Sequence, residues 1–282
     1  MKRTTVQRLA TSLVGIPAAL GVVFFAPGDV AFVVFFLLVF WAAVEFIRLA
    51  YAFAPSAPLG SLLVLIPLAS LAGFAAARLE EPPADAGWWL IAGATLLGLI
   101  AALVTLSSGT AVRDGLAVVG ILVFAVPYFA APPVMLYYLQ VLDPWLLFVF
   151  LAMVWMGDTA AYSIGTWIGR RRLAPSVSPK KSWEGAIASF AACLLVAAIW
   201  SLWRLQELRP EWLAVAGLTG IAAQLGDLVE SLIKRGAGVK DSSDVLPGHG
   251  GLFDRLDAIL LAAPVFLVGA WLLGFESLVP AR

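Results

Sequence analysis

Long apolar stretches separated by short polar connections are the dominant pattern along this chain. Each stretch reaches or approaches the roughly 20 residues that a helix needs to cross the hydrocarbon core of a bilayer. Since backbone polar groups inside lipid must be satisfied within their own segment, such stretches are expected to be helices. The pattern predicts an all-α, polytopic membrane protein with about nine transmembrane helices, at residues 9–26, 30–53, 59–77, 87–106, 115–139, 144–168, 185–203, 212–233 and 256–275.

Two of these stretches allow more than one interpretation. The fifth contains Pro127, Pro132 and Pro133, which could kink it or split it into a helix and a re-entrant piece. The first follows a short basic start, as in a signal peptide, but no small-residue cleavage site follows it and further apolar stretches do. We therefore expect it to be a retained first helix.

The composition agrees with a membrane protein. Hydrophobic residues make up 62% of the 282 residues, charged residues only 13%, and the mean hydropathy is +0.96. These fractions of hydrophobic and charged residues lie outside the range of a soluble domain. The single cysteine, Cys193, lies within an apolar stretch, so it forms no internal disulfide and is expected to be buried in a helix.

The distribution of basic residues predicts the orientation in the membrane. With a cytoplasmic N-terminus, 14 of the 18 Lys and Arg residues fall on the cytoplasmic side. The connections 169–184 and 234–255 are separated by two spans, so they emerge on the same face, where nucleotides are available. The four basic residues on the other side are Arg78, Arg204, Arg209 and Arg282.

The richest polar segment is SLIKRGAGVKDSSDVLPGHGGLFDRLD, at residues 231–257. It interleaves cations with carboxylates around glycines that free the backbone, as a metal-assisted phosphate site requires. The turn around Gly250 and Gly251 would let backbone N–H groups approach a polyphosphate, and His249, the only histidine, would add a donor. The chain has no Walker sequence and no GxGxxG motif that would indicate a soluble nucleotide-binding fold.

Ionisable residues also lie within the apolar helices that flank this segment, where a charge is costly and is usually retained for function. Asp227, Glu230, Ser231 and Lys234 share one helix face, and Asp254 and Asp257 lie one turn apart at the start of the last span. Asp158 has no cation within a helical turn. A structural ion pair, such as Glu230 with Lys234, is the alternative. We expect Asp227 and Asp254 to hold Mg²⁺, which takes one or two protein carboxylates and leaves other positions to phosphate and water.

The connection 169–184, GRRRLAPSVSPKKSWE, is the second basic segment. Arg170, Arg171 and Arg172 could simply contact lipid headgroups. That interpretation suits Lys180 and Lys181 less well, because they lie between Pro179 and the segment Ser182-Trp183-Glu184.

Segment 231–257 closely resembles the signature of the phosphatidate cytidylyltransferases, also called CDP-diacylglycerol synthases. The stretches SPKKSWEG at 178–185 and GDTAAY at 157–162 also resemble family segments. The resemblance is dense over roughly residues 155–260, while in the N-terminal half it rests on hydropathy alone. All fixed positions of the signature are filled: Ser231, Lys234, Arg235, Lys240, Asp241, Pro247, His249, Gly250, Gly251, Asp254, Arg255 and Asp257.

The resemblance implies an integral membrane enzyme that joins phosphatidate to CTP, giving CDP-diacylglycerol and pyrophosphate. It implies dependence on a divalent metal, Mg²⁺, with room for a second cation, and a homodimer in a bacterial inner (plasma) membrane with no nucleic-acid partner. Residues 1–142 would then serve dimerisation or lipid access, and residues 143–282 would be catalytic. The catalytic candidates are Asp227, Asp254, Lys240, Asp241, His249 and Arg255, with Asp227 and Asp254 as metal ligands. The substrate-binding candidates are Lys180, Lys181, Ser182, Ser231, Lys234, Arg235, Gly250, Gly251 and Asp158.

The chemistry needs no covalent intermediate. The second pKa of a phosphomonoester is about 6, so the attacking phosphate oxygen of phosphatidate is already largely ionised at neutral pH. His249 is therefore assigned to phosphate binding or site architecture rather than to acid–base work. Metal ions and cations would bring two polyanions together and stabilise the departing pyrophosphate.

Two alternatives stay open at the level of the sequence. A CTP-dependent lipid kinase would release CDP and would benefit from a base such as Asp158 or Asp241, but the full signature argues against it. An ion-coupled transporter would use the intramembrane acids, but the chain shows no internal repeat with broken helices in matching positions.

Overall fold

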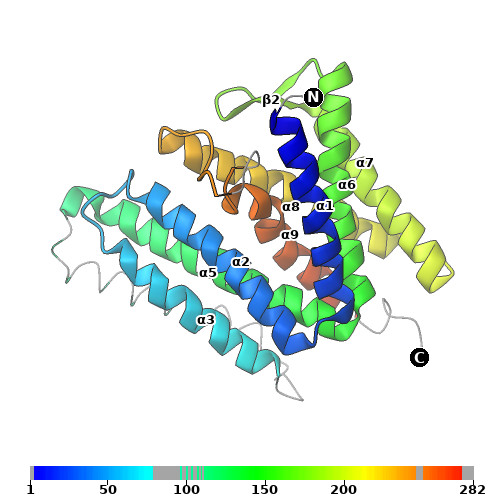
Figure 1. The fold of residues 1–282 in the computed structure, drawn as a ribbon, viewed down its shortest axis with the longest axis horizontal. Helices are drawn as coiled ribbons and strands as arrows, with labels where there is room; N and C mark the ends of the chain where they lie inside the picture. The colour runs from blue at the N-terminus through cyan, green and yellow to red at the C-terminus, as the bar shows by residue number, and fades with distance from the viewer. Residues whose placement is uncertain are drawn as a thin grey trace. The chain divides into compact units, whose positions relative to one another are not determined.

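The computed structural model describes residues 3–78, 111–245 and 250–274 and the single positions 96, 100, 103, 107 and 109. These residues are almost entirely helical, which confirms the all-α prediction (Figure 1). The helices are α1 (Arg3–Phe25), α2 (Gly28–Ala50), α3 (Leu62–Ala77), α5 (Val112–Leu142), α6 (Pro144–Ile168), α7 (Trp183–Trp200), α8 (Pro210–Gly236) and α9 (Phe253–Leu272), with a 3₁₀ turn η1 (Leu59–Ser61) and a π-helical turn η2 (Ser201–Leu205).

Among the described residues, seven helices are long and apolar enough to cross a membrane: α2, α3 with its preceding turn η1, α5, α6, α7 with the following turn η2, α8 and α9. The first predicted span corresponds to α1, in which the structure describes the side chains of the apolar stretch Leu13–Phe25. The fourth, 87–106, lies almost wholly outside the described residues. The predicted count of nine is thus approximate.

The fifth predicted span is neither split nor re-entrant. It forms the single helix α5 of 31 residues, which continues through Pro127, Pro132 and Pro133. Each proline removes one backbone donor, but within a membrane helix neighbouring helices and local adjustments satisfy the freed carbonyls. The alternative of a broken fifth span is therefore wrong.

The described chain folds into two compact units that interleave along the sequence. The first unit comprises the described parts of Met1–Ala31, Met135–Leu232 and Leu256–Arg282, and the second those of Phe32–Val134 and Ile233–Arg255. Most of the signature segment therefore packs with the N-terminal helices. The functional division at residue 142 stays a prediction.

The second unit is built on α2, α3 and α5, which run alongside one another in Figure 1. The rings of Phe32 on α2 and Phe74 on α3 stack with centroids 3.9 Å apart. Ser70 Oγ on α3 donates to the carbonyl oxygen of Ala130 on α5 at 3.1 Å, which satisfies a fully buried hydroxyl between two apolar helices.

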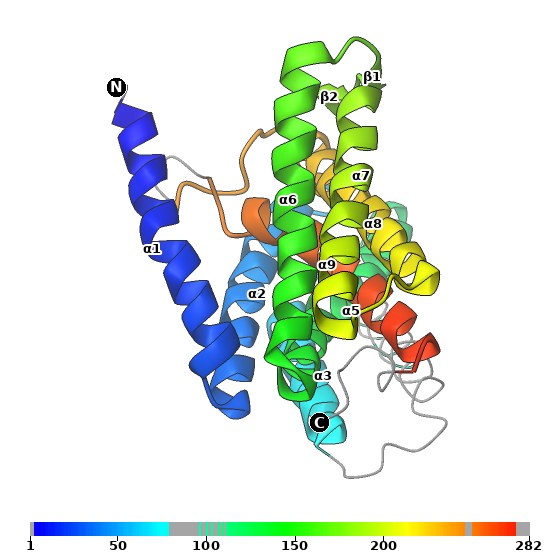
Figure 2. The ribbon, with the colours of Figure 1, turned by 90° about the vertical axis from the view of Figure 1, so that its right-hand side faces the viewer.

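In the first unit, α6 and α7 are antiparallel neighbours joined by a short β-hairpin (Figure 2). Its strands are β1 (Arg172–Ala174) and β2 (Ser178–Ser182), a feature that the sequence did not predict. Cys193 on α7 is buried, as predicted, and its thiol donates to the carbonyl oxygen of Met153 on α6. The ring of Phe266 on α9 packs on Phe150 of α6 and on Trp212 of α8, and all three side chains are fully buried.

Candidate active site

Three carboxylates converge in the first unit. Asp227 and Glu230 lie one turn apart on α8 and Asp257 lies on α9, and an oxygen of each lies within 4.8 Å of the others. Glu230 is only 1% exposed, whereas Asp227 and Asp257 are half-buried. Among the residues that the structure describes, this is the one group of three or more acidic, His or Cys side chains with the spacing of a metal site.

A glycine allows this convergence. A Cβ atom built on Gly226 would overlap the backbone oxygen of Asp257 and would lie 3.2 Å from Cα of Ala258. Gly226 therefore lets the backbones of α8 and α9 touch at this level, which brings the neighbouring Asp227 to Asp257.

A lysine from the hairpin completes this cluster. Lys181 Nζ, near the end of β2, lies 2.6 Å from Asp227 Oδ2, and Ser231 Oγ donates to Asp227 Oδ1 at 3.3 Å. The side chains of Lys181 and Asp227 keep 24% and 36% of their surface exposed, so a ligand can reach both charges. Of the adjacent lysines, the structure brings Lys181 to the acids and leaves Lys180 exposed.

The hairpin that presents Lys181 is fixed by its own polar contacts. Ser182 is buried and caps α7, because its Oγ accepts the backbone N–H of Gly185 at 3.1 Å. The carboxylate of Glu184 accepts the backbone N–H groups of Arg170 and Arg171 at 3.1 and 3.3 Å. Ser182, a predicted substrate-binding residue, thus has an evident structural role, and its contact with substrate stays a prediction.

Asp158 on α6 is exposed, and its role in binding substrate stays a prediction. The structure brings together Lys181 of β2, Asp227 and Glu230 of α8 and Asp257 of α9.

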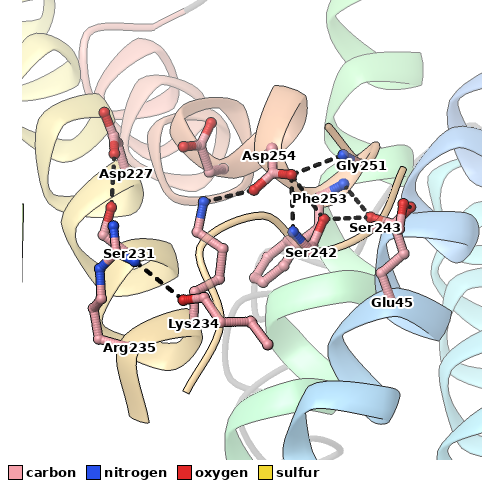
Figure 3. A network of polar contacts seen from close by, with 12 residues as sticks. Glu45, Asp227, Ser231, Lys234, Arg235, Ser242, Ser243, Gly251, Phe253 and Asp254 are labelled. Atoms are coloured by element: carbon pink, nitrogen blue, oxygen red, sulfur yellow. Dashed lines mark hydrogen bonds and ion pairs between the residues drawn. The ribbon is translucent and has the colours of Figure 1, made fainter. Parts of the chain in front are cut away.

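Asp254 lies in the second unit and has a different environment (Figure 3). Its Oδ1 is 2.6 Å from Lys234 Nζ, and the two side chains are only 5% and 11% exposed. Its Oδ2 accepts the N–H of Gly251 at 2.7 Å and the N–H of Ser242 at 3.0 Å, and Ser242 Oγ also lies 3.0 Å away. The Lys234 ammonium and these two N–H groups hold the carboxylate as an anchor for Ser242 and Gly251.

The prediction that Asp227 and Asp254 form the metal pair stays a prediction. The acidic group that the described residues do form pairs Asp227 with Glu230 and with Asp257, one helical turn beyond Asp254 on α9. The sequence places both Asp254 and Asp257 at the start of the last span. In the structure Asp254 is bonded to Lys234 and to backbone N–H groups, whereas Asp257 lies beside Asp227 and Glu230.

The other signature residues lie at the surface or serve the backbone. Arg235, Lys240, Asp241 and Arg255 are exposed, and Arg235 Nη1 donates to the carbonyl oxygen of Val239 at 3.2 Å. Gly250 has a φ of +80°, which favours glycine. The N–H of Gly251 donates to Asp254 Oδ2, and its contact with a phosphate stays a prediction. His249, a predicted catalytic residue, and Pro247 lie outside the described residues.

One buried acid was missed by sequence reasoning. Glu45 on α2 is 1% exposed, and its carboxylate accepts hydrogen bonds from Ser242 and Ser243 in the signature segment (Figure 3). A signal was available, because a glutamate in the run WAAVEFIRLA is an ionisable residue inside a membrane span. Its partners lie about 200 positions away, so the sequence did not show what it contacts.

Comparison with known proteins gives consistent results. A sequence model described as the Cytidylyltransferase family matches residues 6–273. The chain is similar to a phosphatidate cytidylyltransferase of Haemophilus influenzae, with 43% identity over 126 residues that cover 43% of either chain. It is similar to the protein of the same name from Synechocystis, with 44% identity over 118 residues, 40% of this chain and 39% of that one.

A third relative with this name, from Pseudomonas aeruginosa, is 39% identical over 134 residues, which cover 47% of this chain and 49% of that one. The matched part therefore spans less than half the length of each of these curated relatives.

Proposed function

The chain belongs to the cytidylyltransferase family, and from that premise we propose that it is a membrane-bound phosphatidate cytidylyltransferase. It would join CTP to phosphatidate and release CDP-diacylglycerol and pyrophosphate. The names of the curated relatives support this activity and do not favour the lipid-kinase alternative.

The observation that carries the proposal is the approach of Lys181 to the carboxylates of the first unit. A cation paired at 2.6 Å with Asp227, beside Glu230 and Asp257, gives positive and negative groups at one accessible point. Transfer of a nucleotidyl group requires this combination, since phosphates and their counter-cations must be held together.

The three carboxylates fit a divalent cation. Asp227, Glu230 and Asp257 offer hard oxygen ligands within 4.8 Å of one another, and Lys181 pairs with Asp227 at their side. Mg²⁺ suits such a set, because it takes few protein carboxylates and leaves positions for phosphate oxygens. When bound, it would neutralise negative charge on the phosphates during transfer. Asp227 and Asp257, which are half-buried, would face the substrate, and the buried Glu230 would support them from within.

The transfer would proceed by direct displacement. A phosphate oxygen of phosphatidate forms a bond to the α-phosphorus of CTP, and the bond from that phosphorus to the bridging oxygen of the departing pyrophosphate breaks. No side chain needs to remove a proton, because the attacking phosphate is already ionised at neutral pH. Lys181 would orient the phosphates beside Asp227, and the exposed cations Lys180, Arg235, Lys240 and Arg255 are the remaining candidates for binding them.

The setting of the protein follows from its helices and its proposed substrates. The apolar helices make it an integral membrane protein, in which the acyl chains of phosphatidate can stay in the bilayer. We propose an inner-membrane location with the hairpin and the signature segment on the cytoplasmic side, in line with the excess of basic residues there. A homodimer is proposed from the family resemblance alone.

Pyrophosphate release by detergent-purified protein supplied with CTP, Mg²⁺ and phosphatidate tests the proposal. Release that requires the lipid, and that Asp227→Asn abolishes while Arg171→Gln does not, would support both the reaction and the centre. Release of CDP with a lipid alcohol would instead identify a kinase.

A further inference from the structure

Glu45 is the one acidic side chain of α2 that the structure buries almost completely, at 1% exposure. Its Oε1 accepts Ser243 Oγ at 2.7 Å and the N–H of Leu252 at 3.1 Å. Its Oε2 accepts Ser242 Oγ at 2.8 Å and the N–H of Phe253 at 2.8 Å. A carboxylate without partners inside an apolar helix would be strongly unfavourable. The four donors that converge on Glu45 remove that cost.

These donors come from both ends of one loop. Ser242 and Ser243 lie at its start, and Leu252 and Phe253 lie where α9 begins. The N–H groups at a helix start have no partner within the helix, and a carboxylate there is favoured by the helix dipole. Glu45 thus caps α9 from a different helix and closes the loop, as the contacts in Figure 3 show.

Glu45 is also connected to the buried ion pair. Ser242 Oγ lies within hydrogen-bond distance of both Glu45 Oε2 and Asp254 Oδ2, and Asp254 is paired with Lys234. A chain of polar contacts therefore runs from α2 through the loop to the end of α8. Since each member fixes the next, a shift of Glu45 would be transmitted to Asp254 and Lys234.

The second glycine of the signature fits this arrangement. A Cβ atom on Gly251 would overlap both Ser242 Oγ and Glu45 Oε2. The absence of a side chain at Gly251 is thus required by the approach of the loop to Glu45, and its N–H is already directed to Asp254. This glycine serves the contact with α2.

Apolar packing beside Glu45 also holds the start of α9 in place. The ring of Phe46, the next residue on α2, has its centroid 6.1 Å from that of Phe253, and Phe129 on α5 lies 5.7 Å from Phe253. All three rings are buried. The start of α9 is therefore held by aromatic contacts on one side and by Glu45 at its N–H groups.

From these contacts we infer that Glu45 is a positioning residue for nucleotidyl transfer: it clamps Ser242 and Ser243 to the start of α9 so that the charged residues next to them in the signature keep their geometry. The inference rests on the proposed function. It assigns to the N-terminal helices the task of holding the signature. Glu45 acts through Ser242, Asp254 and the backbone of α9, and it does not itself touch substrate.

The test uses Glu45→Gln and Glu45→Ala in the full-length protein, with Asp29→Asn as the matched control on α2, since Asp29 is exposed. Glu45→Gln keeps the size and one acceptor oxygen but places an amide N–H₂ among donors. Turnover should fall roughly 10- to 100-fold, as for residues that orient a catalytic group, with a smaller change in KM for CTP. Asp29→Asn should behave as the wild type.

Two further readouts separate positioning from general stability. Amide hydrogen exchange of peptides covering Ser242–Val245 and Gly250–Arg255 should accelerate in Glu45→Ala, while exchange in α6 and α7 stays unchanged. In addition, Ser243→Ala combined with Glu45→Gln should reduce turnover by less than the product of the two single effects, because both remove the same contact.

The outcomes are distinct. Acceleration of exchange confined to these peptides, with reduced turnover per folded molecule, supports the inference. Normal turnover per folded molecule in both Glu45 variants, or unchanged exchange of the loop, overturns it. If the wild type makes no CDP-diacylglycerol, the proposed function fails, and the exchange measurement still decides whether Glu45 clamps the loop.

Discussion

Lys181 Nζ and Asp227 Oδ2 lie 2.6 Å apart, which ties the end of the β-hairpin to α8. Lys234 and Asp254 are separated by the same 2.6 Å, yet their burial differs. The first pair keeps 24% and 36% of its side-chain surface exposed, whereas the second keeps 11% and 5%. An accessible pair can exchange partners with an anionic ligand, while a buried pair with further donors holds structure. The two pairs should therefore respond differently to substitution.

Replacement of Lys181 should affect catalysis more than folding. Lys181→Met removes the cation beside Asp227, so kcat/KM for CTP should fall roughly 100-fold or more, as for loss of a group that stabilises transition-state charge. Steady-state kinetics in detergent micelles measure this. Arg171→Gln is the matched control, because Arg171 is exposed beside the same hairpin and contacts Glu184 and Trp183 through its backbone. Equal losses in the two variants would contradict the assignment.

Replacement of Lys234 should affect folding first. Lys234→Met leaves Asp254 buried without its cation, which should lower the free energy of unfolding by about 3–5 kcal/mol. The double variant Lys234→Met/Asp254→Asn should recover part of that loss, since it no longer buries an uncompensated charge. Thermal unfolding in detergent reports both. If the double variant is less stable than Lys234→Met, the uncompensated charge of Asp254 is not the cause of the loss of stability.

The acidic cluster should set the dependence on metal. Asp257→Asn and Glu230→Gln each remove one negative charge from the group, so the Mg²⁺ concentration for half-maximal activity should rise roughly 10- to 100-fold. Asp244→Asn, in the exposed part of the signature loop, is the control and should leave the titration unchanged. A change in maximal activity without a shift of the Mg²⁺ titration would argue against these carboxylates as ligands.

Gly226 should tolerate no side chain. In Gly226→Ala the new Cβ would overlap the backbone of Asp257, which cannot rotate away, so α8 and α9 must separate. Such overpacking typically costs about 1–3 kcal/mol, and we expect the Mg²⁺ dependence to weaken with it. Gly120→Ala on α5 is the control, because nothing lies within 4 Å of the added atom; its stability should stay the same or rise by up to about 1 kcal/mol. Unfolding midpoints of the two variants decide.

The transmembrane helices were predictable because lipid imposes one requirement on every span: apolar side chains over enough length. The same signal carries no information about partners. Asp227 and Asp257 could be placed on helix faces from their spacing, and the structure brings them together through Gly226, a contact between residues about 30 positions apart.

Other features were less visible in the sequence. The hairpin strands of three and five residues are too short to show an alternating pattern, so β1 and β2 were not predicted. The resemblance of SPKKSWEG to a family segment makes Ser182 a predicted substrate-binding residue, and the sequence alone does not show that its Oγ caps α7 by accepting the N–H of Gly185. Glu45 was missed because its partners lie far away in the sequence.

In the proposed reaction, the lipid phosphate attacks the α-phosphate of CTP at the centre formed by Lys181 and Asp227. The most direct test supplies purified protein with phosphatidate, Mg²⁺ and CTP labelled at either the α- or the γ-phosphate, and follows the label into lipid. We expect the α-label to enter the lipid, the γ-label to leave as pyrophosphate, and Asp227→Asn to abolish both. Entry of γ-label into lipid, or undiminished α-label transfer by Asp227→Asn, would contradict it.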